Sequence, residues 1–349
     1  MRIAVLLSGG VDSSVALQLL VAAGHECTAF YLKIWLEDEL AHLGRCPWEE
    51  DLAYARAVSE QLAVPLEVRS LQRLYHESIV RQLVAELRAG RTPSPDVWCN
   101  ERVKFGAFAD GLPEAFDRVA SGHYARLRED PGGRVTLLRA RDPVKDQTYF
   151  LSQLSQARLA RCLFPLGDLT KDEVRSAAAA AGLATAERPD SQGICFLGRL
   201  EYDEFVAAHL GEEPGEIVDA DSGRVLGEHR GIWFHTIGQR RGLSLSGGPW
   251  YVVEKDVAER RVVVSRRPLV ARAGTAEIRV PSPRWIGDPP EPGPCRVKVR
   301  HGPHLHRATL ESATPGIRLR LEPPDPGLAP GQFAVVYDGD ECLGGGEMG

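Results

Sequence analysis

The 349-residue chain has few of the features that mark membrane, secreted or zinc-dependent proteins. No apolar run approaches the length of a membrane-spanning helix, and the 43% hydrophobic and 26% charged content is typical of a globular protein. Its seven cysteines form no Cys-x-x-Cys pair and no zinc-ligand spacing. Because the first seven residues already resemble a buried strand, we expect no signal or transit peptide and a cytoplasmic location. In that reducing compartment most of the cysteines should be thiols.

Two common nucleotide-binding motifs are also missing, the Gly-x-x-x-x-Gly-Lys-Ser/Thr loop and the Gly-x-Gly-x-x-Gly turn. In their place stands Ser8-Gly9-Gly10-Val11-Asp12-Ser13-Ser14, between the apolar run 3–7 and an alternating apolar stretch through Leu20. A strand, a turn and a helix in this order point the first helical N–H groups at the turn, which predicts an anion site. The glycines permit close approach of a phosphate, the serines add hydroxyl donors, and Asp12 is suited to Mg²⁺.

The arrangement of strands and helices favours an α/β fold. Short apolar strands at 27–32, 66–68 and 119–120 alternate with helical patterns at 49–62 and 77–89, which predicts a parallel sheet with right-handed crossovers. Ligands of such sheets collect beyond the carboxyl ends of the strands, where both the Ser8 loop and Ser121–Tyr124 stand.

The second half of the chain has a different composition. Glycine and proline become frequent beyond Arg199, and alternating Val, Ile and Arg from Trp250 onward predict antiparallel strands, with a turn-rich connection at 281–294. We therefore predict a catalytic domain at 1–198, a small central module at 199–268 and a C-terminal β-barrel at 269–349.

The charge is unevenly distributed. The net charge is −6, yet residues 224–307 hold 16 Lys and Arg against 7 Asp and Glu. A basic segment on an acidic chain suits a phosphate backbone, and a solvated arginine-rich surface explains it equally well.

Two cysteines stand in loops rich in turn residues. Asp96 precedes Cys99 by three residues in the proline-set loop Thr92–Asn100, and Cys195 lies in the loop Asp190–Phe196. A carboxylate one turn from a thiol can move its proton, and a cation such as Arg102 or Lys104 would be needed to favour the thiolate. For either cysteine taken alone, a buried core thiol is an equally good interpretation.

Taken together, these segments resemble the bacterial-type tRNA-specific 2-thiouridylase family of the PP-loop ATP-pyrophosphatases. The resemblance runs through 8–14, 92–100, 121–126, 145–151, 164–175, 190–196, 236–243, 249–256, 330–332 and 342–346. The two cysteine loops separate it from argininosuccinate, asparagine and GMP synthetases, which share the ATP loop. It implies a PP-loop domain of the adenine nucleotide alpha hydrolase-like kind, followed by the central module and the β-barrel.

The resemblance also implies roles for individual residues. ATP, with Mg²⁺ on Asp12, would activate the C2 oxygen of the wobble uridine as its adenylate. Cys195 would deliver sulfur as a persulfide, Cys99 would resolve the product through a disulfide with Cys195, and Asp96 would serve as acid and base. The expected ATP-binding residues are Leu6, Leu7, Ser8, Gly9, Gly10, Val11, Asp12, Ser13, Leu32 and Gly122. The expected tRNA-binding residues are Ser94, Pro95, Asp96, His123, Lys145, Asp146, Gln147, Arg300, His301 and Gln332.

Expected partners are wobble-uridine tRNAs that accept Lys, Glu or Gln, and a persulfide donor such as a cysteine desulfurase or a sulfur relay protein, with a monomer as the default state. Three alternatives stay open on the sequence. The same reaction could use an iron–sulfur cluster on Asp96, Cys99 and Cys195. An adenylate-forming amide ligase would use the ATP loop without the two thiols, and a non-catalytic tRNA-binding protein would leave that loop idle.

Overall fold

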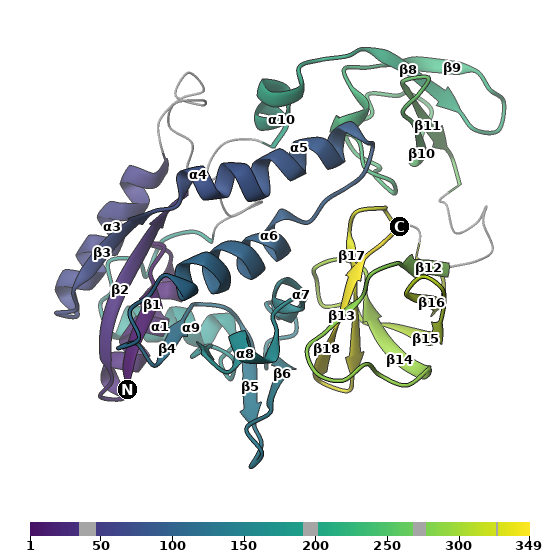
Figure 1. The fold of residues 1–349 in the computed structure, drawn as a ribbon. Helices are drawn as coiled ribbons and strands as arrows, with labels where there is room; N and C mark the ends of the chain where they lie inside the picture. The colour runs from purple at the N-terminus through teal and green to yellow at the C-terminus, as the bar shows by residue number, and fades with distance from the viewer. Residues whose placement is uncertain (35–46, 191–201, 268–276, 326) are drawn as a thin grey trace.

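The catalytic domain is built on a parallel β-sheet. A computed structural model describes residues 1–34, 47–190, 202–267, 277–325 and 327–349 of the chain. The sheet has strand order β3-β2-β1-β4-β7, and each neighbouring pair is parallel, as predicted (Figure 1). Its strands are β1 (Arg2–Leu6), β2 (Glu26–Lys33), β3 (Leu66–Ser70), β4 (Arg118–Ala120) and β7 (Cys162–Leu163).

Helices cover both faces of this sheet because alternate side chains of a strand point to opposite sides. From β1, Ile3 and Val5 pack with Leu17 of α1 and Val58 of α3, whereas Ala4 packs with the helices that contain Leu83 and Val103. The helical elements of the domain are α1 (Val11–Ala22), α3 (Pro47–Gln61), α4 (Gln72–Tyr75), η2 (His76–Val80), α5 (Arg81–Arg88), α6 (Pro95–Trp98), η3 (Cys99–Phe108), α7 (Thr148–Leu151), α8 (Gln156–Leu159) and α9 (Lys171–Ala180). The elements η2 and η3 are π-helical and continue the helices before them.

The central module is a four-stranded sheet with order β10-β11-β8-β9. Its elements are α10 (Tyr202–Leu210), β8 (Gly215–Asp219), β9 (Val225–His229), η4 (Ile232–Phe234), β10 (Tyr251–Asp256) and β11 (Arg261–Ser265). The expectation of antiparallel strands from Trp250 onward holds for β10 with β11, but β11 pairs in parallel with β8. The long connection through 225–256 brings β11 back beside β8 in the same direction, which local alternation does not encode.

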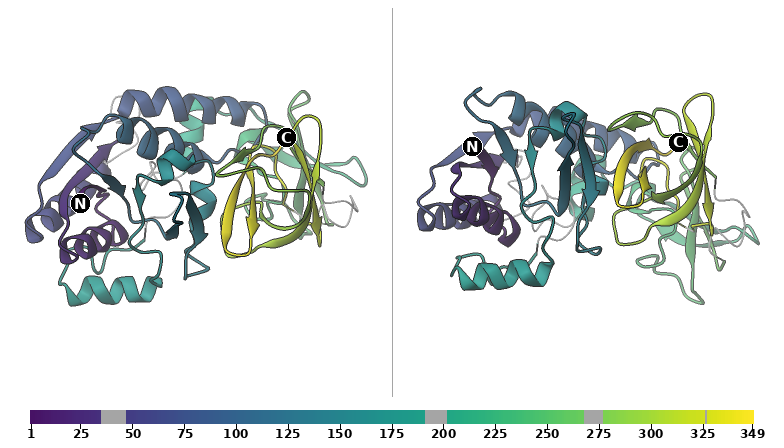
Figure 2. Two further views of the ribbon diagram at one scale, coloured as in Figure 1. Left: turned by 60° about the horizontal axis from the view of Figure 1, so that its bottom comes forward. Right: turned by 90° about the horizontal axis from the view of Figure 1, so that it is seen from below.

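The C-terminal strands curve into a β-barrel beside the catalytic domain (Figure 2). Its strands are β12 (Glu277–Val280), β13 (Arg284–Trp285), β14 (Gly293–Lys298), β15 (His306–Ser312), β16 (Ile317–Glu322), β17 (Phe333–Asp338) and β18 (Glu341–Glu347). A hairpin of the catalytic domain, β5 (Ala125–Glu129) and β6 (Val135–Arg139), adds to this sheet through the pairing of Glu341 with Leu138. The sequence did not predict this addition, because strand pairing between segments about 200 residues apart leaves no local pattern.

A buried ion pair lies at the joint between the β-barrel and the catalytic domain. Lys298 Nζ lies 2.6 Å from Asp146 Oδ2, and both side chains are 0% exposed. The Asp146 carboxylate also accepts hydrogen bonds from the Thr148 hydroxyl at 2.9 Å and the Ala140 N–H at 3.2 Å. Burial raises the pKa of Asp146, but the Lys298 ammonium outweighs it and the pKa lies below its usual value. Asp146 is therefore part of the joint and has no surface left for an RNA contact, unlike the sequence expectation.

Candidate active site

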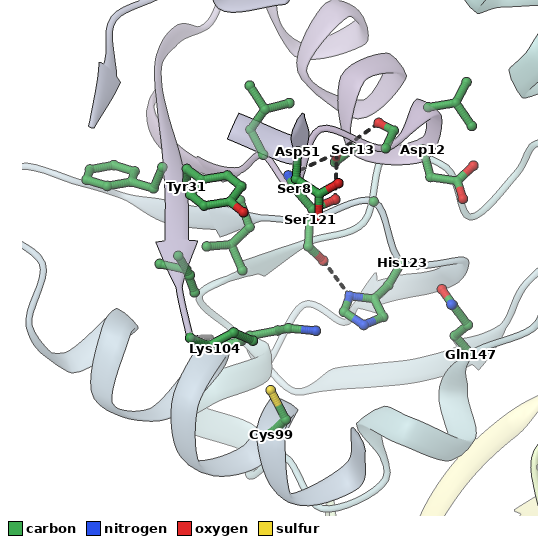
Figure 3. A pocket seen from close by; sticks show the side chains of 18 of the residues that line it. Ser8, Asp12, Ser13, Tyr31, Asp51, Cys99, Lys104, Ser121, His123 and Gln147 are labelled. Carbon is green, nitrogen blue, oxygen red and sulfur yellow. Dashed lines mark hydrogen bonds between the residues drawn. The ribbon is translucent and has the colours of Figure 1, made fainter. Parts of the chain in front are cut away.

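A cavity of about 340 Å³ opens at the carboxyl ends of the parallel strands (Figure 3). The turn between β1 and α1 forms one wall, and β2 with α3 contributes an apolar wall. Facing the turn are the first part of η3, the loop after β4 and the segment 145–147. The expected ATP residues that line it are Leu6, Leu7, Ser8, Gly10, Val11, Asp12, Ser13, Leu32 and Gly122.

The β1–α1 turn has the geometry of an anion site. Gly10 caps α1 without a side-chain hydrogen bond, so the first N–H groups of the 12-residue helix remain for a ligand. The Ser13 hydroxyl lies 3.1 Å from that of Ser8 and donates to the Gly10 carbonyl at 3.0 Å, which folds the turn on itself. Arg188 donates to the Gly9 carbonyl at 2.6 Å and holds the turn from outside.

Two glycines of the site cannot carry a side chain. Gly9 has φ +77°, and a Cβ there would stand 2.2 Å from the Asp51 carbonyl oxygen. At Gly122 a Cβ would stand 2.7 Å from the backbone nitrogen of Ser13. Both glycines let a neighbouring backbone approach the phosphate turn, which is why Gly9 shapes the site without lining the cavity.

A chain of ion pairs runs along one edge of the cavity. Asp12 Oδ1 accepts from the Tyr124 hydroxyl at 2.7 Å and from Lys171 Nζ at 2.6 Å, and Lys171 also lies 2.9 Å from Asp190. Asp190 in turn pairs with Lys145 at 2.7 Å. Partial burial raises the pKa of Asp190, but the hydrogen bonds from Lys145 and Lys171 outweigh it and hold the pKa at about 2.

The opposite wall places a thiol within the same cavity. Cys99, the first residue of η3, is 0% exposed to bulk solvent and lines the cavity together with Lys104 and His123. Figure 3 shows the Cys99 sulfur, the Lys104 amine and the His123 ring turned toward the same space. Burial, with a smaller effect of the Lys104 charge, lowers the pKa of His123 to about 3, so the ring is neutral. Its Nδ1 lies 2.7 Å from the Ser121 hydroxyl.

The residues expected at the RNA divide into two groups. His123, Lys145 and Gln147 line the cavity, where Lys145 pairs with Asp190 and the side-chain Oε1 of Gln147 accepts from the Tyr124 N–H at 3.0 Å. Ser94, Pro95 and Asp96 form the entry to the helical run that carries Cys99; Pro95 is buried and the other two are half-buried.

The β-barrel contributes the other expected RNA residues. His301 stacks on Phe150 of α7 with ring centroids 4.6 Å apart, and Arg300 forms an ion pair with Asp325. The carbonyl of Pro330, two residues before Gln332, accepts from the Thr92 N–H at 2.7 Å. The β-barrel thus reaches the start of the Cys99 loop. Cys195 lies outside the described residues, as does most of its loop.

The basic segment 224–307 is less uniform than its composition suggests. Lys298 lies inside the joint, and burial lowers the pKa of Lys255 to about 8. Arg261 pairs with Glu216 at 3.1 Å, and Arg230 and Arg284 pair with Asp203 and Glu101. Part of this positive charge is therefore matched within the protein.

Several residues of the site were missed by sequence reasoning. The apolar wall includes Tyr31 and Trp48, with the Tyr31 hydroxyl donating to the Trp48 carbonyl at 3.3 Å. Lys171 was within a segment of the family resemblance but had no assigned role. Its position did carry a sequence signal, because Thr170 and Glu173 form a capping box that makes Lys171 the first residue of a helix. The first turn of that helix lies beside Asp12.

A phosphate turn after the first strand of a parallel sheet with order 3-2-1-4-7 defines the class of protein: a PP-loop domain, a class that uses ATP. Family models match along the chain: a tRNA methyl transferase HUP domain at 1–199, a tRNA methyl transferase PRC-barrel domain at 203–266, and an aminomethyltransferase beta-barrel domain at 275–348.

Curated relatives match over nearly their full length. The tRNA-specific 2-thiouridylase MnmA of Porphyromonas gingivalis is 42% identical over 359 residues, covering 99% of this chain and 98% of its own. MnmA 2 of Bacteroides fragilis is 42% identical over 356 residues, covering 100% of each. The chain belongs to the tRNA-specific 2-thiouridylase family, whose members are tRNA-uridine 2-sulfurtransferases.

Among solved structures, the U34-tRNA thiolase NcsA of Methanococcus maripaludis is 15% identical with a TM-score of 0.35, covering 56% of this chain and 62% of its own. No helix among the described residues is long and apolar enough to span a membrane.

Proposed function

We propose that this enzyme converts the wobble uridine of tRNA to 2-thiouridine in an ATP-dependent reaction. The observation that carries the proposal is that the phosphate turn and the Cys99 thiol face each other in one cavity. A carbonyl oxygen is a poor leaving group until it is activated, and sulfur transfer needs thiols. An amide ligase would use the turn but has no use for a thiol opposite it, and a passive RNA-binding protein would need neither.

The walls of the cavity suit the two halves of ATP. The α1 N–H groups and the Ser8 hydroxyl would hold phosphate oxygens, and the apolar wall with Leu32 and Trp48 would cover the adenosine. Asp12 could offer one oxygen to a Mg²⁺ ion. Its Oδ1 already accepts hydrogen bonds from Lys171 and Tyr124, so Oδ2 would be the metal ligand. Mg²⁺ would neutralise charge on the phosphates when bound.

The proposed sulfur transfer uses two thiols. Cys195 would bear the persulfide and attack C2 of the adenylated uridine, which releases AMP. Cys99 would then attack the Cys195 sulfur, form the Cys99–Cys195 disulfide and free the transferred sulfur on C2. Asp96, one turn before Cys99 on the same helical run, would exchange the proton. Ser94, Arg300, His301 and Gln332 lie on the side of the site where the β-barrel meets the Cys99 loop, which supports contacts to tRNA there.

A second version of the reaction would hold an iron–sulfur cluster on Asp96, Cys99 and Cys195. The positions of Asp96 and Cys99, three residues apart on one helical run, favour it as much as they favour proton transfer. Anaerobic purification followed by visible absorption spectroscopy distinguishes the two versions, because a cluster absorbs in the visible range and a persulfide enzyme remains active without iron.

The central test is nucleoside mass spectrometry of unmodified tRNA incubated with the protein, Mg-ATP and a persulfide donor. The expected product is 2-thiouridine at the wobble position, formed by the wild type and absent with Cys195→Ala and Cys99→Ser. Thiolation that persists in Cys195→Ala would exclude the persulfide role. Absence of product with wild-type protein, tested both anaerobically and with a competent donor, would overturn the proposed function.

A further inference from the structure

The loop before α6, which carries the residues expected at the target base, is held by the β-barrel. The Thr92 N–H donates to the Pro330 carbonyl at 2.7 Å, and the Arg91 guanidinium lies 3.8 Å from the Glu347 carboxylate. Both contacts come from one end of the β17–β18 pair, where Glu347 is the register partner of Phe333. The start of the loop is therefore attached to this end of the barrel.

Ser94 stands where a serine usually caps a helix. It directly precedes α6, yet its side chain makes no capping hydrogen bond to that helix. Its hydroxyl instead forms a hydrogen bond with the hydroxyl of Tyr149 on α7. Pro93 and Pro95 fix the backbone φ angle on either side, which leaves this part of the loop little freedom. The Tyr149 contact thus replaces the usual local use of the serine.

The Tyr149 hydroxyl joins this loop to the first residue of β17. It donates to the Phe333 carbonyl at 3.2 Å and accepts from the Phe333 N–H at 3.1 Å. Because its one proton is directed to Phe333, the phenol oxygen accepts the hydrogen bond from Ser94. The Tyr149 side chain is 2% exposed, and burial raises the pKa of Tyr149 to about 12, so the phenol stays protonated at neutral pH. Every hydrogen-bonding position of this buried hydroxyl is used.

We propose that Tyr149 is a positioning residue: its hydroxyl fixes Ser94, and with it the segment 94–96, relative to strand β17 of the β-barrel. The inference rests on the proposed function, in which this segment meets the target uridine. A buried hydroxyl whose hydrogen bonds are all made holds its partners in one arrangement. Because a misplacement of about 1 Å near the reacting groups can cost about a hundredfold in rate, this arrangement should affect the chemical step more than the affinity for tRNA. The β-barrel then aligns the active-site loop in addition to binding RNA.

The test removes a single hydroxyl, and the chain offers a matched control. Tyr337→Phe removes another buried phenol hydroxyl from the same joint, one that bonds at 3.1 Å to Thr148, the neighbour of Tyr149 on α7. In Tyr149→Phe the single-turnover rate of thiolation at saturating tRNA should fall at least about tenfold, the factor that corresponds to about 1.4 kcal/mol. The dissociation constant for tRNA should not change, and Tyr337→Phe should match the wild type in both measurements. On a Ser94→Ala background, Tyr149→Phe should cause no further loss of rate, because the two residues act through one hydrogen bond.

Amide hydrogen exchange of the free protein gives a second measurement that does not depend on activity. Exchange over residues 92–98 should become at least about tenfold faster in Tyr149→Phe and stay unchanged in Tyr337→Phe. Should Tyr149→Phe not fold, Ser94→Ala removes the same hydrogen bond from the loop side and should give the same rise. An unchanged rate or unchanged exchange in Tyr149→Phe, or equal effects in the two tyrosine variants, would overturn the inference. If the wild type forms no 2-thiouridine, the proposed function fails, and the exchange data still decide whether Tyr149 fixes the loop.

Discussion

Lys298 at the domain joint and Lys104 at the cavity both point inward, and their surroundings differ. Lys298 is fully buried against Asp146, whose other hydrogen bonds come from the protein itself. Lys104 is half-buried and extends into a space of about 340 Å³ shared with a thiol and a phosphate turn. The first lysine is closed off from solvent, whereas the second faces a volume that substrates would fill.

The contrast shows that a buried charge can either hold two segments of the fold together or act on the groups that line a cavity. A paired, inaccessible charge fixes the position of a segment, here 145–147, by joining it to β14. A charge on a cavity wall acts on its neighbours: the low pKa of His123 comes mainly from burial, and the Lys104 charge lowers it further. Sequence alone gives both residues the same letter, so the distinction comes from the fold.

The largest expected effect is on the joint. Lys298→Met removes the closer of the two cations paired with the buried Asp146 carboxylate and leaves Arg139 at 3.3 Å, so it should lower the free energy of unfolding by about 3 kcal/mol. Chemical denaturation measures the change. Lys104→Met, which removes a charge from a cavity wall, should cost less than about 1 kcal/mol. The double variant Asp146→Asn/Lys298→Met should recover part of the loss, and equal losses in the two single lysine variants would break the comparison.

Acid should reveal the ion-pair chain at the cavity edge. Because the folded pKa of Asp190 is about 2, below the unfolded value of about 3.9, its contribution is present above pH 4 and is lost as the pH falls toward 2. Since the site is partly exposed, we expect about 1–2 kcal/mol. Thermal unfolding of the wild type and Asp190→Asn between these pH values measures it. A variant curve parallel to that of the wild type would contradict the assignment.

Gly122→Ala tests the phosphate side of the cavity. The new Cβ would press on the backbone of Ser13 and displace the first turn of α1, so affinity for ATP should fall at least about tenfold, or about 1.4 kcal/mol. Isothermal titration calorimetry measures the affinity. Gly132→Ala, in the β5–β6 turn, should bind ATP like the wild type. Unchanged affinity in Gly122→Ala would place the nucleotide elsewhere.

The smallest expected effect concerns the contact between the β-barrel and α7. His301→Ala removes the ring stacked on Phe150 and should lower stability by about 0.5 kcal/mol, since an aromatic pair near the surface contributes little. His301→Phe keeps a ring and should match the wild type in the same denaturation experiment. A loss of several kcal/mol in His301→Ala would make this contact part of the joint rather than an exposed stack.

Local patterns allowed much of the catalytic domain to be predicted. The strand at 27–32 corresponds to β2, the helix at 49–62 to α3 and the strand at 66–68 to β3, because each has a clear period or a flanking turn. The phosphate turn was equally visible, since its glycines and Asp12 follow a buried strand directly. These features depend on residues close together in the chain.

Other features depend on residues far apart, and sequence patterns do not show them. Asp146 lies between two polar residues and so resembles a solvated loop, until Lys298 approaches it from 152 positions away. The placement of Lys104 and Cys99 in one cavity wall depends on the π-helical geometry of η3, which has no sequence signature. The parallel pairing of β11 with β8 likewise depends on a long crossover.

The addition of the β5–β6 hairpin to the β-barrel has a consequence for dissecting the protein. A chain shortened at residue 268 would leave β6 as an open sheet edge, with unpaired N–H and C=O groups ready to pair with another molecule. It would also remove Lys298 and leave Arg139 as the remaining ion-pair partner of Asp146. Such a truncated catalytic domain should self-associate, so its activity would report on aggregation rather than on the loss of RNA-binding residues.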